Sequence, residues 1–187
     1  MKRDLGPKDL IFPAPVLIVG TYGQDGTPNA MNVAWGGICS SVPPAVAISI
    51  RETRRTFANI QAKGAFTVAI ATEDLMVQAD YVGLVSGNDT PDKIRRTGWT
   101  VTPSRFVNAP LFEELPVTWE CEFVRLTEEG NVLGRLVNIS VREDVLAEDG
   151  TVNMEKFKPL VFDHATYDYL KVDGIAGKAF EAGKCLM

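Results

Sequence analysis

The sequence is poor in histidine and cysteine, has no excess of positive charge and contains no long apolar run. Nineteen lysines and arginines stand against 24 aspartates and glutamates, so the formal net charge is −5. Binding along a nucleic-acid backbone needs clustered positive charge, and we therefore expect no nucleic-acid partner. The apolar run at residues 14–20 is far shorter than the ~20 residues of a membrane-spanning helix, and no small-residue cleavage pattern accompanies it. We expect neither a membrane span nor a signal peptide.

The single histidine, His164, limits the chemistry further. It excludes metal sites built from several histidines, and a Ser-His-Asp hydrolase would depend on it without a GxSxG motif. We interpret His164 as structural, with a catalytic role as the alternative. The sequence also lacks GxGxxG and GxxxxGK[ST], so a bound nucleotide would have to be held in another way.

The three cysteines, Cys39, Cys121 and Cys185, are odd in number and far apart. They form neither a disulfide framework nor a CxxC element, which predicts a reducing compartment, the cytoplasm. Cys39 adjoins the candidate ligand-binding residues described below. Without a CxxC partner we interpret it as a small buried hydrophobe rather than a reactive thiol.

Length and composition indicate one globular domain over residues 1–187, because 187 residues divided by about 150 per domain gives little more than one. With 45% hydrophobic and 23% charged residues, the chain can remove roughly 70% of its unfolded surface from water. Apolar β-compatible runs bounded by turn residues predict strands. The predicted strands cover residues 16–19, 29–35, 45–50, 65–71, 117–126 and 132–141.

Helices are predicted between these strands, at residues 53–63, 73–81 and 91–96, with a helical turn at 153–158. Thr53 and Thr90 are candidate N-caps, and Gly64 stands where a helix commonly ends. We interpret Gly36-Gly37 as breakers, residues 83–89 as a loop, and the region from Tyr167 as an irregular tail. Hairpins at Asp25-Gly26 and at residues 128–131 make the neighbouring strands antiparallel.

Antiparallel hairpins with helices inserted between them predict an α+β fold that is mainly β. We expect an antiparallel, Greek-key-like β-barrel, because closure removes the exposed edges that such strands would otherwise leave.

One candidate binding motif is Arg51-Glu52-Thr53-Arg54-Arg55-Thr56, where a strand runs into the start of a helix. Unpaired N–H groups at a helix N-terminus favour a phosphate, to which guanidinium and hydroxyl groups add hydrogen bonds. A capped helix start with solvated arginines is the alternative.

A second candidate motif is the stretch from Asn29 to Gly37, followed by Ser40-Ser41. Side-chain amides, an aromatic plane, two glycines and small hydroxyls suit a flat heteroaromatic ligand with polar edges. The alternative is a barrel strand with Trp35 in the core. Together the two motifs describe a ligand that is flat at one end and phosphorylated at the other, and flavin mononucleotide (FMN) has that shape.

The same residues carry a family resemblance. The order Asp25-Gly26-x-Pro28-Asn29-Ala30-Met31-Asn32-Val33-Ala34-Trp35, then Ser40-Ser41-x-Pro43-Pro44, then Arg51-x-Thr53-Arg54-Arg55-Thr56 resembles the flavin reductase-like, FMN-binding split-barrel family, and within it most of all the flavoredoxins. The likeness continues through Asp92-Lys93, Trp119-Glu120-Cys121 and Tyr169-Leu170 and covers nearly the whole chain.

This resemblance implies a homodimer of split β-barrels that binds FMN non-covalently near the subunit interface. It also implies electron transfer with a redox protein partner, or reduction of the flavin by NAD(P)H. The residues that it assigns to FMN are Asn29, Ala30, Met31, Asn32, Val33, Ala34, Trp35, Ser40, Ser41, Arg51, Arg54, Arg55, Thr56 and Lys93. Of the arginines, Arg55 is the one we favour least for phosphate, and Lys93 has the alternative of a solvated helix-start residue.

The sequence departs from the family at one place. Many of its flavin reductases carry a histidine in the hairpin before the strand that here contains Gly134, where this chain has Glu129-Gly130-Asn131. An asparagine cannot become cationic near neutral pH, which favours an electron carrier over a flavin reductase. His164 could replace that histidine in space. A non-catalytic module that binds a flavin or another phosphorylated ligand is the third hypothesis.

Overall fold

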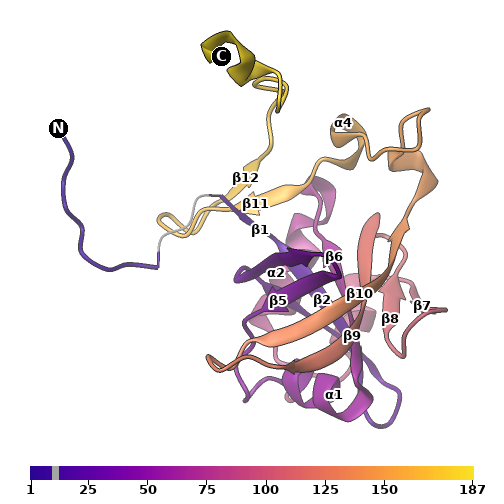
Figure 1. The fold of residues 1–187 in the computed structure, drawn as a ribbon. Coiled ribbons are helices and arrows are strands. Elements are labelled where there is room, and N and C mark those ends of the chain that lie inside the picture. The colour runs from indigo at the N-terminus through magenta and orange to yellow at the C-terminus, as the bar shows by residue number, and fades with distance from the viewer. Residues whose placement is uncertain (10–12) are drawn as a thin grey trace.

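The computed structural model describes residues 1–9 and 13–187, and its main element is an antiparallel sheet of seven strands in the order β3-β2-β6-β9-β10-β5-β4. The two edge strands, β3 and β4, follow each other in sequence and are joined by only Ala34 and Trp35. The sheet must therefore curl until its edges approach, which produces the open barrel seen in Figure 1. The strands are β2 (Leu17–Tyr22), β3 (Pro28–Val33), β4 (Gly36–Ser41), β5 (Pro44–Ile48), β6 (Ala65–Ile70), β9 (Val117–Leu126) and β10 (Val132–Val141).

Shorter elements cover the sheet. A three-stranded sheet joins β1 (Ala14–Pro15), β11 (Leu160–Phe162) and β12 (Tyr169–Lys171), and a hairpin joins β7 (Val101–Pro103) to β8 (Pro110–Phe112). The helices are α1 (Arg55–Lys63), η1 (Glu73–Leu75), α2 (Met76–Leu84), α3 (Lys93–Thr97), η2 (Glu143–Val145), α4 (Met154–Phe157) and η3 (Ala182–Leu186). Within the described part of the chain, no helix is long and apolar enough to cross a membrane.

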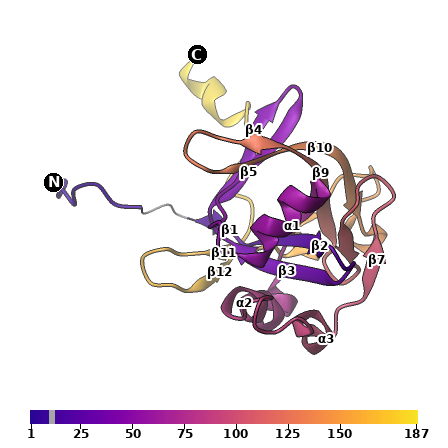
Figure 2. The ribbon, with the colours of Figure 1, turned by 90° about the horizontal axis from the view of Figure 1, so that it is seen from below.

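Two apolar cores lie on opposite faces of β2, β3 and β6. Helix α1 packs on the inner face, whereas α2 and α3 cover the outer face (Figure 2). Because successive residues of a strand point to opposite faces, each strand contributes to both cores. The inner core contains Leu17, Val19, Val33, Val46, Ile48, Phe57, Ile60, Phe66 and Val68. The outer core contains Val16, Ile18, Ala30, Ala79, Val82, Ile94, Trp99 and Phe112.

The mainly β, antiparallel α+β barrel predicted from the sequence is confirmed, as are the bounds of β9 and β10. Helix α1 ends at Gly64, whose φ of 66° is left-handed and whose N–H donates to Ile60 O. The helical turn near residue 153 is α4, and Asn153 caps it by accepting from the N–H groups of Glu155 and Lys156.

Several predicted boundaries are wrong. Gly36-Gly37 does not break the chain but opens β4, where a Cβ on Gly36 would lie 2.6 Å from Cγ2 of Ile48. This glycine serves close packing between strands rather than a turn. Neither Thr53 nor Thr90 is an N-cap, because α1 and α3 begin after Arg54 and Asp92, without a side-chain capping bond.

The two segments that sequence analysis left irregular also contain regular structure. Helix α2 runs through Leu84 into the predicted loop, and β12 lies inside the predicted tail. Residues 171–187 are exposed throughout, and the C-terminal end stands clear of the sheet (Figure 1).

Candidate functional site

A small cationic hollow lies where the start of α1 and the start of α3 meet the edge strand β3. Its volume is about 20 Å³. The charged side chains come from Arg54, Arg55 and Lys93, and the loop after α2 closes it. The whole lining consists of Asn29, Met31, Arg54, Arg55, Thr56, Val82, Gly83, Val85, Ser86, Gly87 and Lys93.

Lys93 is the most deeply buried charge of this hollow, with only 2% of its surface exposed. Its Nζ donates to Val82 O at 3.1 Å and to Val85 O at 2.7 Å, and no carboxylate pairs with it among the described residues. Burial, with the nearby Arg54 cation, lowers the pKa of Lys93 to about 8. An ammonium group has three protons, so one remains for an anionic ligand that would supply the missing counter-charge.

The three predicted arginines differ in position. Arg54 lines the hollow, is half-buried and makes no ion pair within the described ranges. Arg55 also lines it, but its Nη1 donates to Gly87 O at 3.3 Å and its Nη2 lies 4.0 Å from Asp25 Oδ1. Arg51 is exposed and lies outside the lining of the hollow. The structure therefore brings Arg54 and Lys93 together as cations with free donors, and leaves Arg51 apart.

Asn29 forms the floor of the hollow. Its Nδ2 donates to Thr56 Oγ1 at 2.9 Å, whereas its Oδ1 is buried without a partner in the described chain. A Cβ on Gly87 would lie 2.3 Å from this Oδ1, so only glycine permits the loop after α2 to close over Asn29. A buried amide end without a partner, beside two cations, indicates a site shaped for a polar ligand.

Two further cavities lie beside β3 next to the hollow, and we call the three together the groove. The hollow shares Gly83 with a cavity of about 340 Å³. That cavity shares Ala34 with a second one of about 410 Å³. β3 is an edge strand of the described sheet. The backbone N–H and C=O groups along its unpaired edge therefore have no neighbouring strand and face this groove. Polar ligand atoms can pair with them.

The predicted stretch from Asn29 to Trp35 is divided by the alternation of the strand. Asn29 and Met31 face the hollow beside α1, whereas Asn32 and Ala34 face the cavity beside α2. Ala30 and Val33 belong to the two apolar cores and are 0% and 4% exposed. Those two residues can offer a ligand only their backbone.

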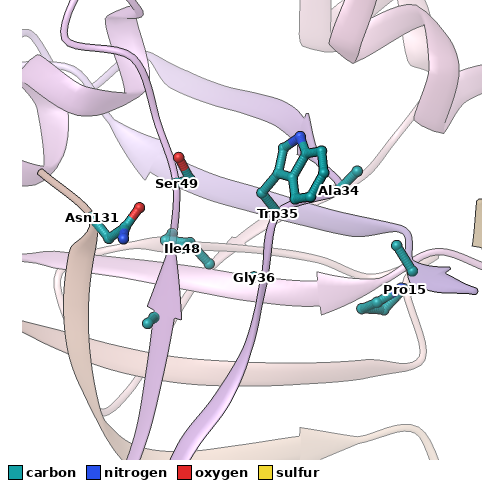
Figure 3. A pocket seen from close by; sticks show the side chains of 9 residues that line it. Pro15, Ala34, Trp35, Gly36, Ile48, Ser49 and Asn131 are labelled. Atoms are coloured by element: carbon teal, nitrogen blue, oxygen red, sulfur yellow. The ribbon is translucent and has the colours of Figure 1, made fainter. Parts of the chain in front are cut away.

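The larger cavity is lined by Trp35, Ser49 and Asn131 (Figure 3). Trp35 is 37% exposed, so the alternative of a core tryptophan is wrong. In Figure 3, Trp35 and Asn131 stand on opposite sides with Ser49 between them. Asn131 comes from the β9–β10 turn, where the family resemblance places a histidine, so this turn does reach the cavity.

His164 supports the same tryptophan. Its ring lies 4.2 Å from that of Trp35 and 4.9 Å, edge to face, from that of Phe162. Its Nε2 is buried without a partner in the part of the chain that is described. These contacts agree with the structural interpretation of His164, because its ring packs, tilted by 37°, against that of Trp35.

The cavity of about 340 Å³ carries a hydrogen-bonded chain on its wall. Asn32 Nδ2 donates to Ala79 O at 3.1 Å and to Tyr169 Oη at 3.4 Å, and Tyr169 donates to Asp80 Oδ1 at 2.9 Å. Burial, with the Asp80 carboxylate, raises the pKa of Tyr169 to about 12. Tyr169 is therefore protonated at neutral pH and remains a donor to Asp80.

Ser40 and Ser41 lie elsewhere on the chain. They stand at the far end of β4, next to the turn into β5, and line none of these cavities. Cys39, between Ile38 and Ser40, is exposed, so its interpretation as a buried hydrophobe is wrong. Cys121 is the buried thiol, and its burial raises its pKa.

Sequence reasoning missed several lining residues, among them Asp80 of α2 and Ser49 after β5. Gly83 and Gly87 line the hollow from residues 83–89, the stretch that its clustered glycines predicted as a loop. Each permits a close approach, since a Cβ on Gly83 would lie 3.0 Å from Cβ of Asn32.

Comparisons of the sequence and of the structure with known proteins agree with one another. The flavin reductase like domain matches residues 10–171. The flavoredoxin of Desulfovibrio vulgaris (Miyazaki F) superposes with a TM-score of 0.94 at 37% identity, over 98% of this chain and 100% of that one. A flavoredoxin from Methanosarcina acetivorans gives a TM-score of 0.90 at 25% identity, over 100% of both chains. A protein of Aquifex aeolicus is 26% identical over 162 residues, 81% of each chain.

Proposed function

The chain belongs to the flavin reductase like family, and from this premise we propose that it is an FMN-binding flavoprotein that carries electrons between redox partners. Its fold is the split barrel of that family. The observation that carries the proposal is the series of neighbouring cavities along β3, with the cations Arg54 and Lys93 at one end and Trp35 at the other.

The residues present fit FMN at both ends. A phosphate would supply the counter-charge that Lys93 and Arg54 lack among the described residues, and Gly87 lets the loop after α2 close over Asn29 beside these cations. The cavities beside Ala34 have the size range of sites for flat organic ligands, and their polar groups are few. We assign Arg54, Thr56 and Lys93 to the phosphate of FMN. We assign Asn32 and Trp35 to the flavin ring and its ribityl chain.

Bound FMN would supply reversible uptake of electrons. The chain's own part is to hold the ring and exclude water from one side of it. Trp35, fixed by His164, closes the larger cavity, and the free backbone groups of β3 provide donors along the groove.

Asn131 favours the carrier over a flavin reductase. It lines the same cavity as Trp35, and as a neutral amide it cannot charge to assist nicotinamide chemistry. The alternative, an NAD(P)H-dependent reductase that supplies reduced FMN, is separated by stopped-flow mixing with NADH or NADPH. The electron-carrier hypothesis predicts a slow loss of the flavin absorbance after mixing. Rapid bleaching would instead establish the reductase.

We also propose a single domain that forms a homodimer in a reducing compartment such as the cytoplasm. Apolar side chains remain exposed on the sheet, among them Ile38, Val137 and Ile139, and the free thiols of Cys39 and Cys185 are exposed. A second copy would also give Ser40 and Ser41 a route to a flavin site that their own chain does not offer. Light scattering that returned the mass of one chain with flavin bound would reject the dimer.

The first experiment is an absorption spectrum of the purified chain, followed by release of any chromophore and its identification by mass. The proposal predicts a yellow protein that releases FMN at about one per chain. Arg54→Ala should weaken FMN binding, and Arg51→Ala is the matched control outside the hollow. A colourless protein that also fails to bind added FMN would contradict the function, and equal loss in both variants would contradict the assignment of Arg54.

A further inference from the structure

We propose that Tyr169 and Asp80 lock Asn32 as a hydrogen-bond acceptor facing the groove, so that the site selects a ligand group that donates, either a hydroxyl or a ring N–H. This inference rests on the proposed function and extends it to two positioning residues, Asp80 and Tyr169. They come from α2 and β12, which are distant in sequence from the predicted binding motifs.

The orientation of the Asn32 amide follows from its neighbours. Ala79 O lies 3.1 Å from one end of the amide. A backbone carbonyl only accepts hydrogen bonds, so the nitrogen must face it, because an oxygen there would oppose another acceptor. This contact decides which end is Nδ2.

Tyr169 engages the second amide proton. Its Oη lies 3.4 Å from Asn32 Nδ2 and donates its own proton to Asp80 Oδ1 at 2.9 Å. With its proton committed to Asp80, Tyr169 can only accept from Asn32. Both amide protons are then used, which leaves Asn32 Oδ1 as the free hydrogen-bonding atom of this side chain.

That oxygen is open to the cavity. Among the described residues no donor reaches Asn32 Oδ1, and it is not one of the fully buried polar atoms that lack a partner. Asp80 adds an acceptor on the same wall, since no lysine or arginine of the described chain forms an ion pair with it. The wall therefore complements hydroxyl and N–H groups, while the cationic hollow beyond Gly83 complements phosphate.

The test compares flavin affinity in the full chain for Asn32→Ala, Tyr169→Phe and the double variant. Loss of one well-formed hydrogen bond predicts a rise of about tenfold in the FMN dissociation constant for Asn32→Ala, and about threefold to tenfold for Tyr169→Phe. Tyr22→Phe is the matched control. It removes a tyrosine hydroxyl from β2, outside the cavities along β3, and should change affinity less than twofold.

The double variant distinguishes positioning from direct contact. If Tyr169 acts through Asn32, Tyr169→Phe has no further effect in the Asn32→Ala background. A full additional loss in that background would mean that Tyr169 touches the ligand itself and would overturn the proposal. Riboflavin and lumiflavin identify the donor, because lumiflavin has the ring without the ribityl hydroxyls. An Asn32→Ala loss seen with riboflavin alone assigns a hydroxyl, and one seen with both assigns the ring N–H.

A readout without flavin keeps this inference separate from the proposed function. In the ligand-free chain, the side-chain amide protons of Asn32 should exchange slowly with solvent, and Tyr169→Phe should accelerate their exchange about tenfold. If the wild-type chain binds no flavin but shows this effect, the proposed function fails and the lock stands. If exchange is fast in the wild type, the lock fails whatever the chain binds.

Discussion

The two ends of the groove along β3 are built differently. At the end that we propose for the phosphate of FMN, the phosphate end, Arg54 and Thr56 come from one short motif, and Lys93 adds a buried cation from α3. At the ring end, the lining comes from segments spread over the chain, among them Asn32, Asp80, Asn131 and Tyr169. Under the proposed function, the first end would recognise a charge, and the second, the ring end, would recognise shape and the direction of hydrogen bonds.

This difference determines how each end fails. A phosphate group is attracted by cations on several sides of it. Loss of one cation should therefore weaken phosphate binding strongly, while the shape of the hollow stays the same. The ring end relies on hydrogen-bonding groups, most of them neutral, that each contribute little, and it depends on their mutual positions. We therefore expect large, pH-dependent effects near Lys93 and small, geometry-dependent effects near Trp35.

The largest effect is expected for the pair Arg54→Ala and Lys93→Met, in which Met keeps the apolar stem of the lysine. Loss of two charge-assisted contacts should weaken FMN binding by on the order of 100-fold to 1,000-fold. Riboflavin, which lacks the phosphate, is the internal control and should bind the variant as it binds the wild type. Fluorescence titration measures both ligands, and an equal loss for riboflavin would contradict the division of the groove.

The next largest effect concerns the glycine over Asn29. Gly87→Ala places a Cβ 2.3 Å from Asn29 Oδ1 and 3.1 Å from Arg55 Cδ. Displacement of these groups should destabilise the fold by about 1–3 kcal/mol and weaken FMN binding. Gly37→Ala is the matched control, because nothing lies within 4 Å of its added Cβ. Thermal unfolding of the two variants would contradict the prediction if both lost the same stability.

A pH dependence should appear at the phosphate end alone. The pKa of Lys93 is lowered to about 8 in the folded chain, against 10.5 when unfolded. Between these values the unfolded chain binds more protons, so the ligand-free protein gains stability as pH rises through about 8. In the proposed site the phosphate of FMN pairs with the charged lysine, so the affinity for FMN should fall over the same interval. Titrations on both sides of pH 8 check this, and Lys93→Met should remove both trends.

The same contrast explains which parts of the molecule the sequence revealed. Residues 51–56 form a local motif at a strand-to-helix junction, and Arg54 and Thr56 do lie in the hollow. The long hairpin of β9 and β10 was equally predictable, because its turn and alternation are local. Their positions follow from short stretches of chain.

The ring end could not be assembled in this way. Asp80 and Tyr169 meet Asn32 only because α2 and β12 pack beside the same strand, and no spacing in the sequence records that contact. The short strands β1, β7, β8 and β11 were missed because two or three residues carry too little pattern. Gly36 was read as a breaker because a glycine used for close packing looks the same in sequence as one used for a turn.

The smallest effect tests the ring end directly. Asn131→His introduces a group that can become cationic below about pH 6.5 into the cavity beside Trp35. FMN affinity should change less than about twofold, since Asn131 lies on the wall away from the phosphate hollow. A cation there favours the reduced flavin, so the midpoint potential should rise by up to about 30 mV as the pH falls, the value for a tenfold preference in a two-electron couple.

Spectroelectrochemistry at several pH values measures this, with Asn131→Ala as the neutral control. A potential that follows the control at every pH would place residue 131 outside the reach of the ring, and would leave the carrier hypothesis without the contrast between Asn131 and a histidine.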